Sequence, residues 1–200
     1  MKQLPVYKLV LSEDLNNSTG LSTISFVKEP AIEETFVYFS KDEPTEIKFS
    51  IQEDRQIITG PALIPNMRIE RNIPEPHYVY IDKEGIELTV KKFFKMNRIG
   101  NVNAEHTSLL LSGVYPFESF ISDASRGINP PSQFKDLPDG TLFLSYSIES
   151  PEIWKQVKNG TFNGFSIEGG YNMLEVKMSK IESSEDQDQL DLYNLFSSLY

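Results

Sequence analysis

Short runs of apolar and β-branched residues, separated by polar turns, fill the first eighty positions and predict strands. Residues 1–14 hold one such run, without the long apolar core and small-residue cleavage site of a signal peptide. Residues 77–82 (HYVYID) are aromatic and alternate, which is typical of a half-buried strand. The other strands expected in this part are 24–27, 36–39, 47–51 and 55–64.

Two later segments change to the helical period. In 83–97 the apolar residues repeat on one helical face, and Asp82 is placed to cap the N-terminus. A second, shorter helix begins with Ser150 as N-cap and Pro151 in the first turn, and Gly160 ends it. The residues on the apolar face of the first helix are Ile86, Val90, Phe93 and Phe94.

Most of the remaining apolar runs again predict strands. A proline-containing loop over 123–139 interrupts them, and a loop of that length is often functional. The pattern as a whole predicts an α+β fold with a mainly antiparallel sheet, curled into a β-barrel and flanked by two helices. The strands expected in this part are 109–111, 117–121, 141–146, 164–171 and 174–178, the last with one buried face.

The last 22 residues differ from the rest of the chain. Residues 179–189 have many acids and no apolar period, whereas 190–200 again place apolar residues on one helical stripe. We therefore divide the chain into a folded domain over 1–178 and a tail over 179–200, an acidic linker that ends in a short amphipathic peptide. We expect this peptide to dock onto a partner, with the linker as a tether and a candidate self-cleavage region.

Composition narrows the chemistry further. The chain of 200 residues has no cysteine and two histidines, so thiol nucleophiles, disulfides and cysteine-ligated metals are excluded. The formal net charge of −10 argues against binding to nucleic acid. No window approaches 18 apolar residues, so we expect no membrane span. No motif calls for a cofactor or a metal, and we expect neither.

Ser166 is a candidate nucleophile. It lies in Gly164-Phe-Ser-Ile-Glu-Gly169, which is close to the GxSxG nucleophile elbow, although the second glycine comes one position late. The elbow serine follows a strand and begins a helix, whereas this serine follows a short helix and begins a strand. The α/β-hydrolase interpretation is therefore rejected, and with it a small-ester hydrolase is disfavoured. A serine among glycines, open to close backbone approach, is what remains.

A serine nucleophile needs a base, and the chain offers two histidines. His106 follows a turn-rich stretch and precedes a predicted strand, whereas His77 enters a strand directly after Pro-Glu-Pro. We assign His106 as the candidate base, and we interpret His77 as a structural or surface residue.

An acid should orient the imidazole. Glu118 lies twelve residues after His106, and a hairpin between the two would bring them together. Glu168 and Glu175, in the strands at and after the serine, are the alternatives.

Several segments, in order, resemble phage serine proteases of the XkdF type, relatives of the prohead maturation proteases. The resemblance covers about residues 20–172, and the tail lies outside it. The matching blocks are 24–31, 55–66, 69–71, His106, 117–121, 140–142, 151–160 and 163–169.

The resemblance implies a herpesvirus-protease-like fold, a curled β-barrel surrounded by helices. By position it makes Ser166 the nucleophile and His106 the base. Glu118 lies in a matching block, but in relatives the third residue follows the serine, so Glu168 and Glu175 stay open. The oxyanion hole needs backbone N–H groups, for which Gly169 and Gly170 are candidates.

The resemblance also implies a role: a serine endopeptidase that cleaves scaffold or capsid-protein segments, and itself, inside the assembling prohead in the bacterial cytoplasm. The expected partners are the major capsid protein and the scaffold protein, with the portal and further copies of the chain as additional candidates. The alternative is a catalytically silent capsid-interior or scaffold-like protein that retains the protease fold.

Overall fold

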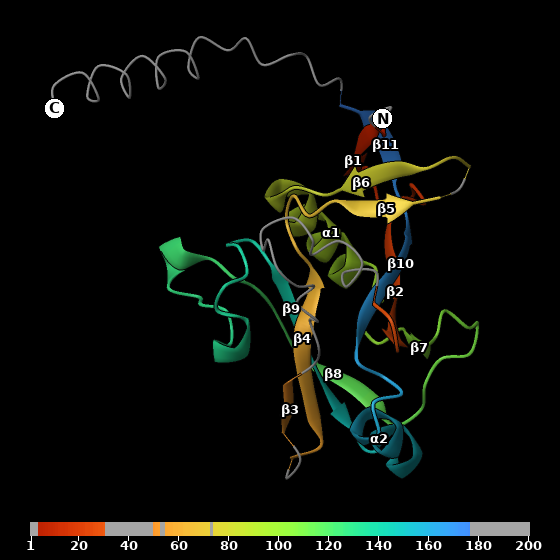
Figure 1. The fold of residues 1–200 in the computed structure, drawn as a ribbon, viewed down its shortest axis with the longest axis vertical. Helices are drawn as coiled ribbons and strands as arrows, with labels where there is room; N and C mark the ends of the chain where they lie inside the picture. Colours follow the sequence, from red (N-terminus) through yellow and green to blue (C-terminus); the bar gives the residue numbers. More distant parts are fainter. Residues whose placement is uncertain (1–3, 31–49, 53–54, 73, 177–200) are drawn as a thin grey trace, which may run out of the picture.

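The computed structural model describes residues 4–30, 50–52, 55–72 and 74–176, and these form an α+β fold of mostly strands with two α-helices (Figure 1). The helices are α1 (Lys83–Lys95) and α2 (Pro151–Lys158). Two single 3₁₀ turns, Ala124–Arg126 and Ser132–Phe134, lie within the predicted loop. The strands are β1 (Val6–Val10), β2 (Gly20–Val27), β3 (Ser50–Gln52), β4 (Ile57–Leu63), β5 (Ile69–Arg71), β6 (His77–Tyr80), β7 (Val102–Ala104), β8 (Val114–Ile121), β9 (Leu142–Ile148), β10 (Gly164–Gly170) and β11 (Asn172–Glu175).

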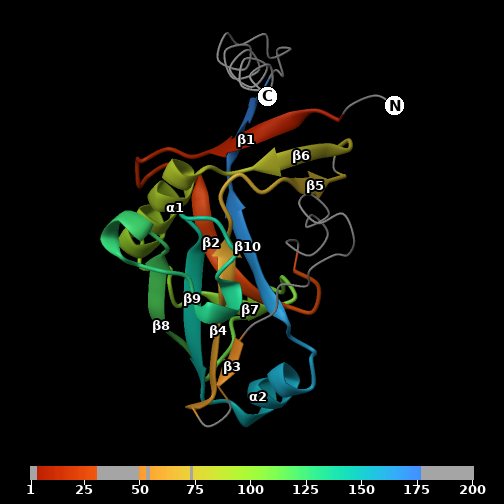
Figure 2. The ribbon, with the colours of Figure 1, turned by 60° about the vertical axis from the view of Figure 1, so that its left-hand side comes forward.

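The described strands form three sheets, in the orders β11-β1-β6-β5, β10-β2-β7 and β3-β4-β9-β8. Most pairs are antiparallel, as predicted, and the two parallel pairs are β1 with β6 and β2 with β7. None of the three sheets closes on itself, so the barrel stays a prediction. Figures 1 and 2 agree that β2 and β10 run side by side, with the pair β4 and β9 next to them.

Both predicted helix starts are confirmed. The Asp82 carboxylate accepts a hydrogen bond from the Gly85 N–H at 2.9 Å, and the Ser150 hydroxyl accepts one from Ile153 N–H at 3.3 Å. The apolar face of α1 buries Ile86 and Phe93 almost completely, whereas Phe94 is 48% exposed. Phe94 follows Phe93 by about 100° around the helix, which turns it away from the core.

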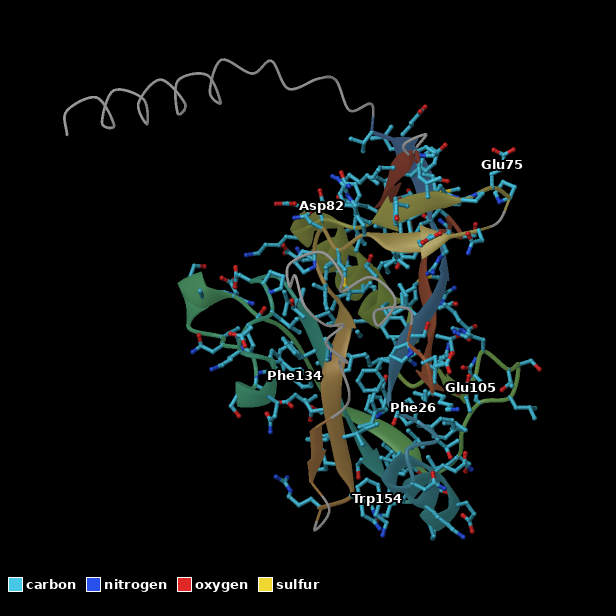
Figure 3. All side chains as sticks on the ribbon, in the orientation of Figure 1. Phe26, Glu75, Asp82, Glu105, Phe134 and Trp154 are labelled. Atoms are coloured by element: carbon cyan, nitrogen blue, oxygen red, sulfur yellow. The ribbon has the colours of Figure 1, made fainter. Side chains whose placement is uncertain are left out.

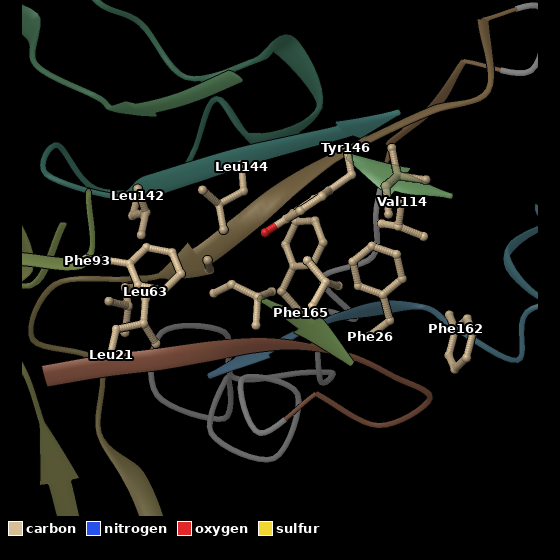
Figure 4. Packing of buried hydrophobic residues seen from close by; sticks show 14 of the residues in the cluster. Leu21, Phe26, Leu63, Phe93, Val114, Leu142, Leu144, Tyr146, Phe162 and Phe165 are labelled. Carbon is tan, nitrogen blue, oxygen red and sulfur yellow. The ribbon is translucent and has the colours of Figure 1, made fainter. Parts of the chain in front are cut away.

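An aromatic cluster joins the β10-β2-β7 sheet to the β4-β9 pair. Phe26 on β2 and Phe165 on β10 point toward Tyr146 on β9 (Figure 4), with ring centroids 5.3 Å and 5.4 Å from that of Tyr146. All three side chains are almost fully buried. Because side chains alternate along a strand, the residues next to Phe26 and Phe165 face the other side of the sheet.

Some expected strands differ in the structure. Residues 109–111 contribute only one isolated bridge, and Leu109 and Leu110 are exposed. All of β11 is exposed, so the predicted burial of Leu174 is wrong, whereas Val176 is half-buried and Met178 lies outside the described residues. Among the described strands, β11 is at a sheet edge and pairs with β1. The short strands β5 and β7 were not predicted, since three residues carry too little periodicity. The predicted strand 36–39 and the tail 179–200 lie outside the described residues.

Within the described part of the chain, no helix is long and apolar enough to cross a membrane.

Candidate active site

Three polar residues lie in one row across the β10-β2-β7 sheet, on the face opposite the aromatic cluster. Ser166 on β10 pairs with Ser25 on β2, and Ser25 pairs in turn with Asn103 on β7. Directly paired residues share a face of the sheet, and so do residues two apart on one strand. Glu168, two residues after Ser166, therefore belongs to the same face.

A tight turn directly after β7 carries His106. The Thr107 N–H donates to the Ala104 carbonyl at 3.0 Å, and the two central residues, Glu105 and His106, have φ of 48° and 56°. This is the pattern of a type I′ turn, which ordinarily takes Asn-Gly because both central residues need positive φ. The Glu105 carboxylate accepts the Lys28 backbone N–H at 2.7 Å, which fixes the turn to the end of β2. Figure 3 labels Glu105 on this turn.

The turn directs the His106 imidazole over the polar row. Its Nδ1 lies 3.1 Å from the Glu168 Oε1 and 3.2 Å from the Ser25 Oγ. His106 is half-exposed, with 47% of its side chain accessible, and 30% of the Glu168 side chain is accessible. An imidazole whose Nδ1 contacts a carboxylate is the arrangement of the histidine–acid pair in serine hydrolases.

The Glu168 carboxylate is held in its ionised form. Partial burial opposes ionisation, but hydrogen bonds from Asn103, Ser25 and His106 outweigh it and lower the Glu168 pKa below its ordinary value. The Asn103 Nδ2 donates to Oε1 at 2.7 Å and the Ser25 hydroxyl at 2.8 Å. An ionised carboxylate only accepts hydrogen bonds, so the 3.1 Å contact with Glu168 is a hydrogen bond in the tautomer that carries the proton on His106 Nδ1.

The two serines of the row differ in access. Ser25 is completely buried, and its hydroxyl also contacts the Asn103 amide oxygen. Ser166 is partly exposed, and it borders a cavity of about 50 Å³. Within the described residues, Ser166 and His106 are not hydrogen-bonded to each other.

The comparisons with known proteins identify a family. Residues 45–175 match the model of the family described as "Putative phage serine protease XkdF". The chain belongs to this family. The match confirms the resemblance drawn from the sequence, and it includes His106, Ser166 and Glu168, whereas Ser25 lies outside it. No curated protein and no solved structure matches the chain significantly.

The family description supports a serine protease role in general terms, so the position of each candidate acid is relevant. Of the three, the structure brings Glu168 to His106. Glu118 lies on β8, exposed, and accepts a hydrogen bond from Ser145 at 2.7 Å, because β8 pairs with β9 rather than with the segment after His106. Glu175 is exposed on β11.

His77 lies apart from this site. It is 6% exposed, donates from Nδ1 to the Glu75 carbonyl at 2.6 Å, and packs its ring edge against Tyr7. These contacts agree with a structural role for His77.

The candidate oxyanion glycines lie farther along β10. Gly169 is three residues after Ser166, about 10 Å along a strand. A Cβ at Gly169 would come 2.4 Å from the Gly20 carbonyl oxygen, where a β-bulge presses β10 against β2. This close packing explains the glycine at 169 without an oxyanion role, and the assignment of Gly169 and Gly170 stays a prediction.

Sequence reasoning missed two members of the site, Ser25 and Asn103. Ser25 stands in the first block that resembles the family, and Asn103 is three residues before His106, but an isolated serine and an isolated asparagine carry no catalytic pattern. In the described ranges, no group of three or more His, Asp or Glu side chains is arranged to hold a metal.

Proposed function

We propose that this protein is a serine endopeptidase with Ser166 as nucleophile, His106 as general base and Glu168 as the acid that orients it. The observation that carries the proposal is the hydrogen bond between His106 Nδ1 and Glu168 Oε1, placed over a strand that pairs with the Ser166 strand. The match of residues 45–175 to a family of putative phage serine proteases supports the serine protease class.

The chemistry follows from the tautomer. With Nδ1–H donated to Glu168, the His106 Nε2 has a free lone pair and accepts the proton of Ser166. The Ser166 oxygen then bonds to the scissile carbonyl carbon. When the C–N bond breaks, His106 returns that proton to the leaving amine, and an acyl-enzyme forms. Water, deprotonated by His106, then attacks the ester carbon. The bond between this carbon and the Ser166 oxygen breaks, His106 returns the proton to Ser166, and the new carboxyl end leaves.

Accessibility favours Ser166 over Ser25 as the nucleophile. Ser25 has no exposed surface, and its hydroxyl already contacts three polar groups, so a peptide carbonyl has no route to it. Ser166 has both surface and an adjoining space.

The adjoining cavity suggests a substrate preference. Its walls are mainly apolar, with Arg71 and Tyr80 as polar members, and β10 contributes Ser166 and the two flanking residues. A peptide extended beside β10 would alternate its side chains between the His106 face and this cavity. We therefore expect an aliphatic side chain close to the scissile bond. Residues that line the cavity include Leu63, Met67, Ile69, Val79, Phe165 and Ile167.

The proposed biological substrates are segments of the scaffold and capsid proteins of an assembling phage prohead, and the chain itself. The support is the phage origin in the family description, together with the acidic tail that follows the folded domain and suits a cleavable tether. The proposed setting is therefore the prohead in the bacterial cytoplasm, with capsid and scaffold proteins as partners and the portal or further copies of the chain as additional ones.

A fluorophosphonate probe tests the nucleophile directly, because it reacts with activated serines. The full-length protein is labelled, digested and mapped by mass spectrometry. We expect label on Ser166, no label in Ser166→Ala or His106→Ala, and label retained in His77→Ala. Label on Ser25, or equal cleavage of capsid and scaffold proteins by wild type and Ser166→Ala, would refute the assignment.

One observation favours the second candidate, a catalytically silent scaffold-like protein. Ser166 and His106 are not joined by a hydrogen bond within the described residues, and a nucleophile normally contacts its base, although apo sites are often looser. The same labelling experiment decides: a folded wild type that takes no label at any serine, alone or mixed with its capsid and scaffold proteins, supports the silent protein.

A further inference from the structure

We propose that Asn103, together with Ser25, is a positioning residue that sets the tautomer of His106 by holding Glu168 and the His106 turn in one hydrogen-bonded unit. The inference rests on the proposed function for its catalytic consequence, but its structural part is independent of activity.

Asn103 joins the acid to the turn that carries the base. Its Nδ2 donates one hydrogen bond to Glu168 Oε1 at 2.7 Å and another to the Thr107 carbonyl at 2.6 Å. Thr107 is the last residue of the type I′ turn that presents His106. One amide group therefore fixes the distance between the carboxylate and the imidazole.

Ser25 is the third member of this unit, and it contacts Asn103, Glu168 and His106. Its hydroxyl lies between the Asn103 Oδ1, the Glu168 Oε1 at 2.8 Å and the His106 Nδ1 at 3.2 Å. A hydroxyl has a single proton, so it donates to one oxygen while it accepts from a neighbouring N–H. In the arrangements in which Ser25 donates to Glu168 or to Asn103, its oxygen accepts the His106 Nδ1–H, and these are the arrangements that the proposed unit maintains.

The hydrogen bonds of Ser25 and Asn103 are made by buried side chains. Ser25 is 0% exposed and Asn103 is 3% exposed, so water does not replace a lost partner at either residue. Hydrogen bonds in such surroundings are stronger than in water, and they constrain orientation. Without Asn103, Glu168 and the strained turn lose their shared donor, and His106 becomes free to take up the other tautomer.

The test uses the fact that the chain has only two histidines. Full-length protein labelled with ¹⁵N at histidine gives ring-nitrogen signals for His106 and His77 alone, and these report which nitrogen carries the proton. Where the ring signals report a neutral imidazole, wild type should show Nδ1–H for His106. In Asn103→Ala the Nε2–H form should become the major species, while His77 is unchanged and acts as the internal reference.

The rate of fluorophosphonate labelling provides the catalytic readout. We expect Asn103→Ala to lower the maximal labelling rate at Ser166 by about tenfold or more and to leave the probe's binding constant unchanged. The upper limit of this loss is the ~10²–10⁴-fold acceleration that a general base supplies. Asn101→Ala is the matched control, because the Asn101 amide donates at 3.0 Å to the Ser22 carbonyl and has no contact with Glu168 or His106.

A wild-type tautomer and labelling rate in folded Asn103→Ala would overturn the inference, as would equal losses in Asn101→Ala. If Asn103→Ala does not fold, Asn103→Asp keeps the volume, lacks the N–H donors and is judged by the same two criteria. If the tautomer changes in Asn103→Ala but neither wild type nor any variant is labelled at Ser166, the proposed function is refuted and this inference stands.

Discussion

The contact between Gly169 and the β2 backbone gives the sharpest test of how the site is held. A Cβ built at Gly169 lies 2.4 Å from the Gly20 carbonyl oxygen and 3.0 Å from both Gly20 C and Leu21 Cα. All three are backbone atoms, which cannot rotate away as a flexible side chain would. In Gly169→Ala the two strands must therefore separate at the bulge, directly after Glu168.

The cost is that of overpacking a contact between two backbones, about 1–3 kcal/mol. For a domain of this size, each kcal/mol lowers the melting temperature by about 2–4 °C, so we expect Gly169→Ala to melt roughly 2–12 °C below wild type. Since the displaced segment carries Glu168, labelling at Ser166 should slow as well.

The neighbouring glycine supplies the control. A Cβ at Gly170 would lie 3.6 Å from the Ser18 carbonyl oxygen, an ordinary contact. Gly170→Ala should therefore keep the wild-type melting temperature in calorimetry and the wild-type labelling rate. Equal melting of the two variants would refute the packing argument, and a loss of labelling without loss of stability in either one would restore its candidacy for the oxyanion hole.

Three further predictions concern the Glu168 carboxylate, the cavity beside β10 and the tail over 179–200. The Glu168 pKa is lowered from its ordinary 4.5, so the ionised form of Glu168 stabilises the fold above that pH. The difference in unfolding free energy between wild type and Glu168→Gln should therefore shrink as the pH falls below 4.5. A constant difference from pH 6 to 3 in urea titrations would contradict this. Ile69→Trp fills the cavity, so it should lower the ratio of kcat/KM for peptides with leucine beside the scissile bond to kcat/KM for peptides with alanine there by about 10-fold or more. Glu70→Gln, at an exposed position of the same strand, should leave this ratio unchanged. Deletion of 179–200 should abolish incorporation into proheads and preserve labelling of Ser166; normal incorporation of the truncated chain would refute a docking role for the tail.

The sequence predicted correctly those features that depend on residues close together in the chain. Both helices begin where Asp82 and Ser150 predicted, because capping is a local interaction. The choice of acid depended on strand pairing over long sequence separations, which no local pattern reveals. Glu118 is near His106 in sequence but pairs with Ser145, whereas Glu168 is 62 residues away and contacts it.

The turn at His106 was beyond prediction for a different reason. Glu-His at the centre of a type I′ turn contradicts turn preferences, since left-handed backbone costs about 1–2 kcal/mol per non-glycine residue. Such strain persists only where surrounding contacts enforce it, and here the bonds of Glu105 to Lys28 and of Asn103 to Thr107 do so. A position where local preference fails is therefore the position that carries the proposed base.

The aromatic core and the polar site depend on each other through strand parity. Phe26 and Phe165 face Tyr146 because they pair across β2 and β10, and the same pairing sets Ser25 opposite Ser166 on the other face. A slip of one residue would send the serines into the core and the phenylalanines to the His106 side. Burial of the aromatic rings opposes that slip. The packing that stabilises the fold therefore also fixes the strand of Ser166 relative to Ser25, which contacts both His106 and Glu168.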